Sequence, residues 1–209
     1  LDDNFKEEVL LSCLFQIAFS LHYLQKHYSF THNDLHINNI MFSKTETKYL
    51  YYKINNKYFR IPTFGKIFKI IDFGRSIFTF KNKKFYNDVF SKNSEAYGQY
   101  YYPSQIRFHK ENEKNKIQPN YNFDLCRLSM TILDELNKDI SDKMMNLLNH
   151  MCTDKNGNNY CNMPDDFSLY INISKDAVNS LPIDILENNI FKNYRVTKKN
   201  FPLKSYYKL

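Results

Sequence analysis

The sequence predicts a single domain of the α+β class, mainly α-helical with a small β-hairpin region. Three observations predict this class. The chain has 209 residues, of which 43% are hydrophobic, which is enough for one substantial core and too few for two. Apolar side chains recur at helical spacing over 5–28 and 123–136. Two runs rich in β-formers, 49–54 and 57–61, flank an Asn-Asn pair at 55–56, which favours a hairpin turn because Asn tolerates positive φ.

The first predicted element is the helix over 5–28, whose apolar residues are separated by three and four positions throughout. Asp2 and Asp3 stand where their side chains and charges favour the start of a helix. A polar loop over 31–39 follows, and it leads into a short apolar strand at 40–42.

The middle of the chain alternates between clear and weak signals. After the predicted hairpin, the apolar run 67–71 predicts another strand, which ends directly before an Asp-Phe-Gly sequence. From 75 to 121 the periodicity fades, and the polar stretches 81–84 and 109–118 are expected to be irregular and mobile.

Two helical patterns are expected in the second half of the chain besides 123–136. The first is a second amphipathic helix over 140–151. The C-terminal part contains several Pro residues and predicts short helices and loops, with 175–191 as the most favoured helix.

Composition excludes several classes of protein. With a mean hydropathy of −0.59 and no apolar run of ~18–20 residues, no membrane-spanning helix and no membrane partner are expected. The net charge of +7 comes from scattered Lys residues without interleaved aromatic rings, so no nucleic-acid partner is expected. The four Cys residues form no CxxC pair, so we expect reduced thiols and a cytoplasmic location. The chain begins at Leu1 without Met or a signal peptide, so we expect a piece of a longer polypeptide.

The residues that carry chemistry lie in the polar loop and after the strand 67–71. The loop holds His32, Asp34 and Asn39, and the strand leads into Asp72. Phosphoryl transfer needs a carboxylate near the acceptor hydroxyl and hard oxygen ligands for Mg²⁺ on the phosphates. Asp34 is a candidate for the first role, and Asn39 and Asp72 for the second. The alternative is that these are ordinary turn residues.

The motifs resemble those of a known family. The sequence His-Asn-Asp-Leu-His-Ile-Asn-Asn at 32–39, followed by Ile-Asp-Phe-Gly at 71–74, resembles the catalytic loop and the metal-binding loop of the protein kinase superfamily. The segment 123–128 resembles the kinase helix whose Asp, here Asp124, supports the catalytic loop; a simple helix cap is the alternative for this residue. The insertion at 43–66 is similar to kinase-like proteins of giant DNA viruses.

The resemblance implies that 1–209 is the C-terminal lobe of a protein-kinase-like fold, a partial kinase domain with the hairpin region at the cleft. It implies that Asp34 is catalytic and that Asn39 and Asp72 hold Mg²⁺ on the ATP phosphates. His36 is a further candidate in the catalytic loop, with a structural role and a phosphate contact both open.

The remaining motif residues receive supporting roles from the same resemblance. It implies that His32 packs beneath the loop and that Asp124 accepts hydrogen bonds from it. Phe73 is expected against the preceding helix. Gly74 is expected to allow a sharp turn after Asp72.

The function implied by the resemblance is Mg²⁺-dependent transfer of the ATP γ-phosphate to Ser or Thr hydroxyls of protein substrates by the parent protein. ATP would be the co-substrate, and a viral protein would act in the host cytoplasm. A kinase also needs a Gly-rich loop and a strand Lys on the phosphates. Only four Gly residues occur, at 65, 74, 98 and 157, so this N-terminal lobe is absent from the chain, and the chain alone is expected to be inactive.

Two departures from the kinase pattern leave alternatives open. Asn33 stands in place of the usual Arg, so switching by phosphorylation of the activation loop is not expected. His36 occupies the position where Ser/Thr protein kinases usually carry Lys, and a His there is also seen in choline- and aminoglycoside-kinase-like enzymes. A small-molecule phosphotransferase and a catalytically inactive pseudokinase that binds a partner are therefore the alternative functions.

Overall fold

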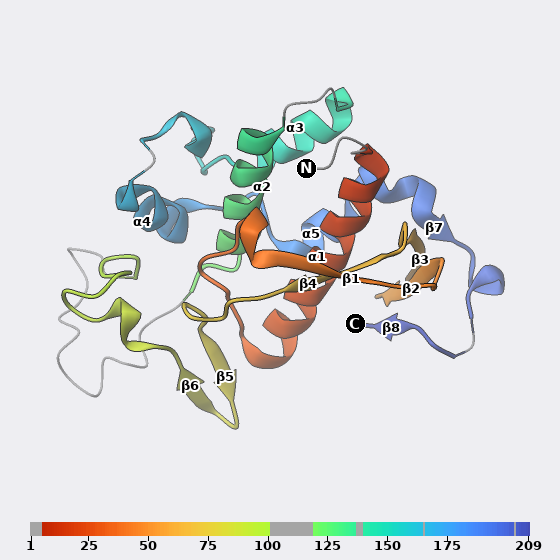
Figure 1. The fold of residues 1–209 in the computed structure, drawn as a ribbon, viewed down its shortest axis with the longest axis horizontal. Coiled ribbons are helices and arrows are strands. Elements are labelled where there is room, and N and C mark those ends of the chain that lie inside the picture. Colours follow the sequence, from red (N-terminus) through yellow and green to blue (C-terminus); the bar gives the residue numbers. More distant parts are fainter. Residues whose placement is uncertain (1–5, 101–118, 137–139, 165, 203) are drawn as a thin grey trace.

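The computed structural model describes residues 6–100, 119–136, 140–164, 166–202 and 204–209. Over these residues the fold is mixed α/β, with helices and three small sheets, and it is compatible with the predicted α+β class. The longest helix, α1 (Glu7–Tyr28), passes through the middle of the molecule, with β1 and β4 in front of it and α5 behind it in Figure 1.

The boundaries of α1 follow from its sequence. Lys6 is at the N-cap without a side-chain hydrogen bond, and Glu7 and Glu8 place negative charge in the first turn, where it is favourable. Ser29 ends the helix in the left-handed conformation, with its N–H donating to the Gln25 carbonyl. The predicted capping residues Asp2 and Asp3 lie outside the described residues.

The predicted hairpin is confirmed. Strand β2 (Tyr49–Ile54) pairs antiparallel with β3 (Lys57–Pro62), and Asn55 turns the chain with a φ of 52°. The same sheet gains β7 (Arg195–Val196) beside β3 and β8 (Tyr207–Lys208) parallel to β2. The C-terminal end of the chain therefore returns to the insertion and extends its sheet (Figure 1).

A separate two-stranded sheet lies next to the candidate catalytic loop. Strand β1 (Ile40–Lys44) pairs antiparallel with β4 (Lys66–Ile70), with Ile40 opposite Ile70. Because the loop 31–39 precedes β1 and residues 71–74 follow β4, this pairing brings the two motif segments to the same end of the sheet.

One part of the main core lies between α1 and the four-stranded sheet. Phe15 is fully buried, and its ring lies 5.1 Å from Tyr52, 5.1 Å from Phe59 and 5.0 Å from Phe191, measured between ring centroids. Aromatic pairs at this separation stabilise a core beyond the area that they bury. Helix α5 (Pro182–Glu187) packs against the other side of α1.

The remaining helices are α2 (Phe123–Glu135), α3 (Asp142–Met151) and α4 (Phe167–Asp176), and the first two match the predicted helices over 123–136 and 140–151. The buried side chains of α3 belong to the main core, whereas α2 and α4 contribute most of a second core. The buried residues of this cluster are Phe123, Cys126, Met130, Cys152, Tyr160, Leu169, Ile173 and Ala177.

Residues 81–84, which were predicted to be irregular, form the turn and part of one strand of a hairpin. Residues Phe78–Phe80 and Lys83–Phe85 form the hairpin strands β5 and β6, with Lys81 and Asn82 both at positive φ in the turn. The rings of Phe78 and Phe85 stack at 5.2 Å, a cross-strand pair that stabilises the hairpin. The other predicted mobile stretch, 109–118, lies outside the described residues.

The single helix predicted over 175–191 was wrong. Helix α4 ends at Asp176, α5 begins at Pro182, and a 3₁₀ segment occupies Asn189–Tyr194. Pro182 has no N–H to continue a helix, so it starts one instead. The Nδ2 of Asn120 donates to the Ala177 carbonyl at 2.8 Å, which satisfies a group left free where α4 ends.

Short 3₁₀ segments complete the fold at Ile37–Asn39, Asp88–Phe90, Tyr160–Asn162 and Lys198–Asn200. The first of these lies in the candidate catalytic loop, directly before β1. None of the helices in the described ranges is both long and apolar enough to cross a bilayer.

Candidate active site

The side chain of Asp124 anchors the backbone of the candidate catalytic loop through two hydrogen bonds. The N–H of His32 donates to Oδ2 of Asp124 at 2.9 Å, and the N–H of Asn33 donates to Oδ1 at 2.8 Å. Asp124 is fully buried, and burial raises the pKa of this carboxyl, while the charge of His32 and the two backbone hydrogen bonds act in the opposite direction. Asp124 lies inside α2, after the cap position at Asn122, so its side chain supports the loop and does not act as a simple cap.

The loop is also tied to the segment that follows β4. Nε2 of His32 lies 2.9 Å from the Ile71 carbonyl, and Nδ2 of Asn33 donates to the Arg75 carbonyl at 2.9 Å. Thr31 and Ile77 exchange two backbone hydrogen bonds of 2.9 Å each. Asn33 is fully buried with a φ of 66°, so a neutral hydrogen-bonding side chain fills the place of the Arg that the kinase pattern has here.

The side chain of Asn39 is oriented by two neighbours. Its Nδ2 donates to the Asp34 carbonyl at 2.9 Å and lies 3.1 Å from Nε2 of His36. Burial lowers the pKa of His36, although the charge of Asp34 raises it, and this favours the neutral ring that accepts from Asn39. Both amide hydrogens are thereby engaged, and the amide oxygen accepts no hydrogen bond from the described part of the chain.

Asp72 lies next to Asn39 because the N–H of Ile71 donates to the Asn39 carbonyl at 3.0 Å. Asp72 has a φ of 60°, a left-handed conformation that costs an L-residue roughly 1–2 kcal/mol and is concentrated at functional sites. The residue is exposed. The backbones of Asn39 and Asp72 are thus brought together, and within the described residues the Asn39 amide oxygen and Oδ2 of Asp72 accept no hydrogen bond.

The role predicted for Gly74 needs correction. The positive φ that turns the chain belongs to Asp72 and not to Gly74. The Gly74 N–H donates to Oδ1 of Asp72 at 3.3 Å, and a Cβ at position 74 would lie 3.3 Å from the same oxygen. Glycine is favoured here by the close approach of the carboxylate.

The ring of Phe73 contacts two aromatic rings just beyond the C-terminal end of α1. Its ring centroid is 6.0 Å from that of Phe30 and 5.6 Å from that of His32. The side chain stays 53% exposed, so these two rings cover only part of it.

The carboxylate of Asp34 has two partners that the sequence did not predict. Oδ1 accepts from the Tyr170 hydroxyl at 3.2 Å, and Nη1 of Arg75 lies 3.5 Å from it. Arg75 also pairs with Glu95; burial lowers the pKa of Arg75, but the bond to Glu95 and the charge of Asp34 outweigh this and raise it. Arg75 directly follows the Asp-Phe-Gly sequence and was within reach of sequence reasoning, whereas Tyr170 carried no local signal.

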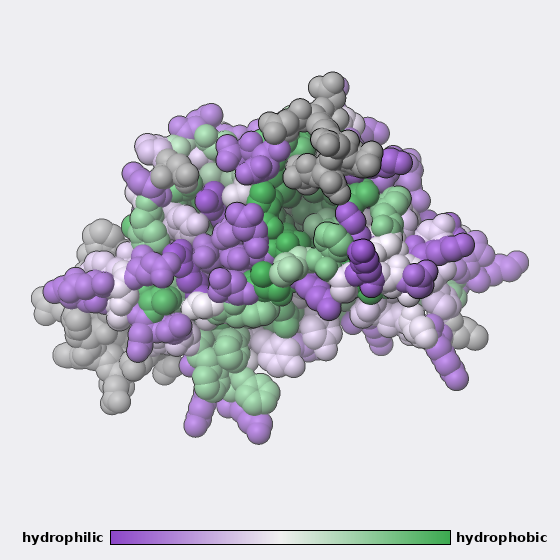
Figure 2. Space-filling view, viewed as in Figure 1, coloured by the Kyte–Doolittle hydropathy of each residue, from purple (hydrophilic) through white to green (hydrophobic). Residues whose placement is uncertain are grey.

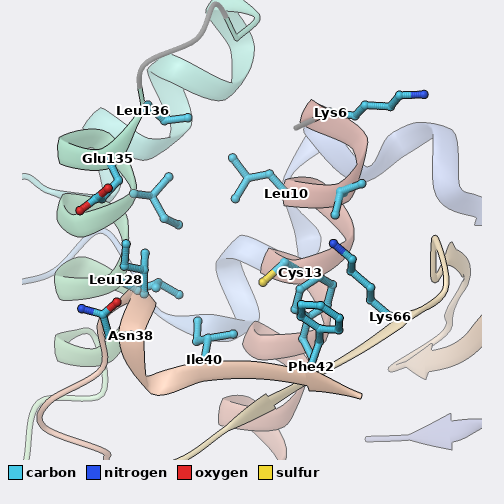
Figure 3. A pocket seen from close by; sticks show the side chains of 14 residues that line it. Lys6, Leu10, Cys13, Asn38, Ile40, Phe42, Lys66, Leu128, Glu135 and Leu136 are labelled. Atoms are coloured by element: carbon cyan, nitrogen blue, oxygen red, sulfur yellow. The ribbon is translucent and has the colours of Figure 1, made fainter. Parts of the chain in front are cut away.

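A pocket of about 490 Å³ lies beside the loop, between α1, the β1–β4 pair and α2 (Figure 3). Its walls are mostly apolar, which is visible as the hydrophobic hollow near the centre of Figure 2. Ile37 and Asn38 of the loop line it, but Asp34, Asn39 and Asp72 do not. Burial raises the pKa of the lining Cys13 thiol to about 12, so this cysteine acts as a small apolar wall residue.

No protein-family profile matches the chain. A protein of Acanthamoeba polyphaga mimivirus, named as a serine/threonine-protein kinase, is 31% identical over 135 residues, which cover 54% of this chain and 34% of that protein. A Dictyostelium discoideum protein of the same designation is 34% identical over 115 residues, covering 44% of this chain and 9% of that protein.

The matched region therefore spans about a third of the viral relative and less than a tenth of the Dictyostelium one. Both relatives are named as serine/threonine-protein kinases. The similarity supports a kinase-like relationship over about half of the chain.

Proposed function

We propose that the protein containing this chain transfers the γ-phosphate of ATP to Ser or Thr hydroxyls of protein substrates, and that residues 1–209 form the C-terminal lobe of its kinase-like fold. The observation that carries the proposal is the side-by-side placement of Asn39 and Asp72, next to the loop that holds Asp34. The named relatives support the class of reaction.

Asn39 and Asp72 are the residues that would hold Mg²⁺. Their amide and carboxylate oxygens are the hard ligands that this ion prefers, and Mg²⁺ commonly takes only one or two side chains together with substrate phosphates. The donor set fits the ion, because the contacts of Asn39 Nδ2 leave its Oδ1 for a cation. When bound, the ion would neutralise charge on the phosphates of ATP.

Asp34 would position the acceptor and take up its proton. The hydroxyl oxygen of the substrate forms a bond to the γ-phosphorus, the bond to the ADP oxygen breaks, and the hydroxyl proton passes to the carboxylate. Both contacts of the Asp34 carboxylate described above engage Oδ1. Oδ2 makes no hydrogen bond within the described ranges, so this oxygen is the one suited to the acceptor hydroxyl.

The other half of the ATP site would come from a different part of the parent protein. The chain has four scattered Gly residues and no Gly-rich phosphate loop. We propose that a preceding lobe supplies that loop and the phosphate-binding Lys, and that 1–209 alone has no measurable ATP turnover.

The test is a radiolabelled phosphate-transfer assay on the full-length protein with Mg²⁺ and a pool of Ser- and Thr-containing peptides. Asp34→Asn and Asp72→Asn should each lower the rate by roughly 10²–10⁴-fold. Asp142→Asn, in the first turn of α3 and away from the loop, serves as the matched control and should keep the wild-type rate.

Equal activity in the wild type and both variants would overturn the proposal. Turnover of choline, sugars or aminoglycosides without any peptide phosphorylation would replace it with a small-molecule phosphotransferase. Absence of ATP binding by the full-length protein would point to an inactive interaction module.

A further inference from the structure

We propose that Tyr170, directed by Arg127, is a positioning residue that orients the carboxylate of Asp34. This inference rests on the proposed phosphoryl transfer and deepens it. Helix α2 would then position the loop in two ways. Asp124 holds the backbone of the loop, and Arg127 orients the Asp34 side chain through Tyr170.

The hydrogen bonds form a chain with a fixed direction. Nε of Arg127 donates to the Tyr170 hydroxyl oxygen at 3.3 Å, and the hydroxyl donates to Oδ1 of Asp34 at 3.2 Å. A guanidinium has only donors, so the phenol oxygen must accept from Arg127 and its single hydrogen is directed to the carboxylate.

The ring of Tyr170 is held from several sides. The guanidinium carbons of Arg127 and Arg75 lie 5.2 Å and 5.5 Å from the ring centroid, within the range of cation–π attraction. The ring stacks on Phe167 at 5.6 Å and lies 5.9 Å from Phe123. This packing limits rotation of the side chain and fixes the position of its hydroxyl.

Tyr170 stays in its donor form at neutral pH. Burial raises the pKa of its phenol, the nearby Arg127 opposes this, and the negative charge of Asp34 raises it further. The hydroxyl therefore keeps the hydrogen that it gives to the carboxylate.

Helix α2 joins this contact to the anchoring of the loop. Asp124 and Arg127 are three residues apart and lie on the same side of the helix. Asp124 fixes the N–H groups of His32 and Asn33, while Arg127 reaches the Asp34 carboxylate through Tyr170. With Oδ1 occupied, Oδ2 is the oxygen presented to an acceptor, and a fixed orientation of this kind speeds a reaction between bound groups.

The charged and titratable groups around Asp34 come from four elements. They are His36 in the loop, Arg75 after β4, Asp124 on α2 and Tyr170 on α4. Removing the Tyr170 hydroxyl takes away the hydrogen bond that fixes Oδ1, so the carboxylate loses a constraint on its orientation toward the acceptor.

The test uses Tyr170→Phe in the full-length protein, which keeps the ring and removes the hydroxyl. A hydrogen bond to a charged group corresponds to about a tenfold change in rate. We expect kcat to fall about 10-fold with little change in the KM for peptide. Tyr23→Phe, on the exposed face of α1, is the matched control and should leave both unchanged.

A double-mutant cycle tests the role of Arg127. Arg127→Met should lower kcat in the same direction, and adding it to Tyr170→Phe should cause little further loss, because the two residues act through one contact. Fully additive losses would contradict the directed chain from Arg127 to Asp34.

The outcomes separate this inference from the proposed function. Wild-type kcat in Tyr170→Phe, with Asp34→Asn inactive, would overturn the inference and leave the phosphoryl transfer standing. Activity in Asp34→Asn would instead overturn the proposed function. A Tyr170→Phe protein whose kcat falls only in proportion to its unfolded fraction, or whose KM for peptide rises at unchanged kcat, would show a merely structural role and also reject the inference.

Discussion

The β2–β3 hairpin and the candidate catalytic loop are both polar turns between regular elements, but they are stabilised by different kinds of contact. In the hairpin, Asn55 turns the chain and the strands pair from Ile54 opposite Lys57 outward. In the loop, the partners of His32 and Asp34 lie as far away as Asp124 and Tyr170. The hairpin turn is stabilised by residues that are close to it in sequence. The loop is stabilised by residues on helices that are distant in sequence.

The difference follows from the cost of closing a loop in the chain. A two-residue turn restricts few residues before the first strand pairs form, whereas contacts between distant residues require a long segment to be ordered first. The hairpin was therefore predictable from a short window. The site depends on α2 and α4 being packed in place.

The largest expected effect on stability is in the hairpin region. Phe59 on β3 is fully buried against Phe15, so Phe59→Ala should lower the free energy of unfolding by about 3–5 kcal/mol. Urea unfolding monitored by circular dichroism measures this. Phe64→Ala, at a 44% exposed position, is the control and should change it by only about 0.5 kcal/mol. Equal losses in both variants would mean that the sheet contributes little to the core.

The second expected effect is in the loop. Asp124→Ala removes the acceptor of two buried N–H groups, and leaving such donors unpaired costs about 2–4 kcal/mol together. Unlike Phe59→Ala, this variant should also lose most phosphate transfer at temperatures where it is folded. Asp142→Ala should lower stability by at most about 1 kcal/mol. Full activity in folded Asp124→Ala would show that the loop keeps its shape without the anchor.

The smallest effect concerns pH. Burial lowers the pKa of His36 in the folded protein, so the unfolded chain binds the proton first as the pH falls. The contribution of His36 is complete above the unfolded pKa of about 6.5 and is lost as the pH drops below it. Unfolding by urea at pH 7.5 and 5.5 should show a smaller acid loss for His36→Gln than for the wild type.

His22 provides the internal reference for that comparison, because burial lowers its pKa as well and it is present in both proteins. An identical acid loss in the wild type and His36→Gln would show that the contact between His36 and Asn39 does not depend on the charge of the ring.

Several elements could be predicted because their patterns are local. The spacing of apolar residues gave the helices over 123–136 and 140–151 to within two residues at each end. The expectation over 175–191 failed because apolar spacing continued across Pro182, and the backbone break there determined the helix boundaries. The β5–β6 hairpin was missed because its turn residues, Lys81 and Asn82, read as a charged loop.

By itself, the sequence determined that oxygen-bearing side chains follow α1 and β4 directly. The positions of these two elements could be predicted because hydrophobic periodicity and turn chemistry act over a few residues. The tertiary structure alone decided that Asp34 shares its carboxylate with Arg75 and Tyr170, and that Asp72 takes the left-handed conformation. These features depend on how α2, α4 and the β1–β4 pair meet in space, and packing between distant elements leaves no periodic mark on the chain.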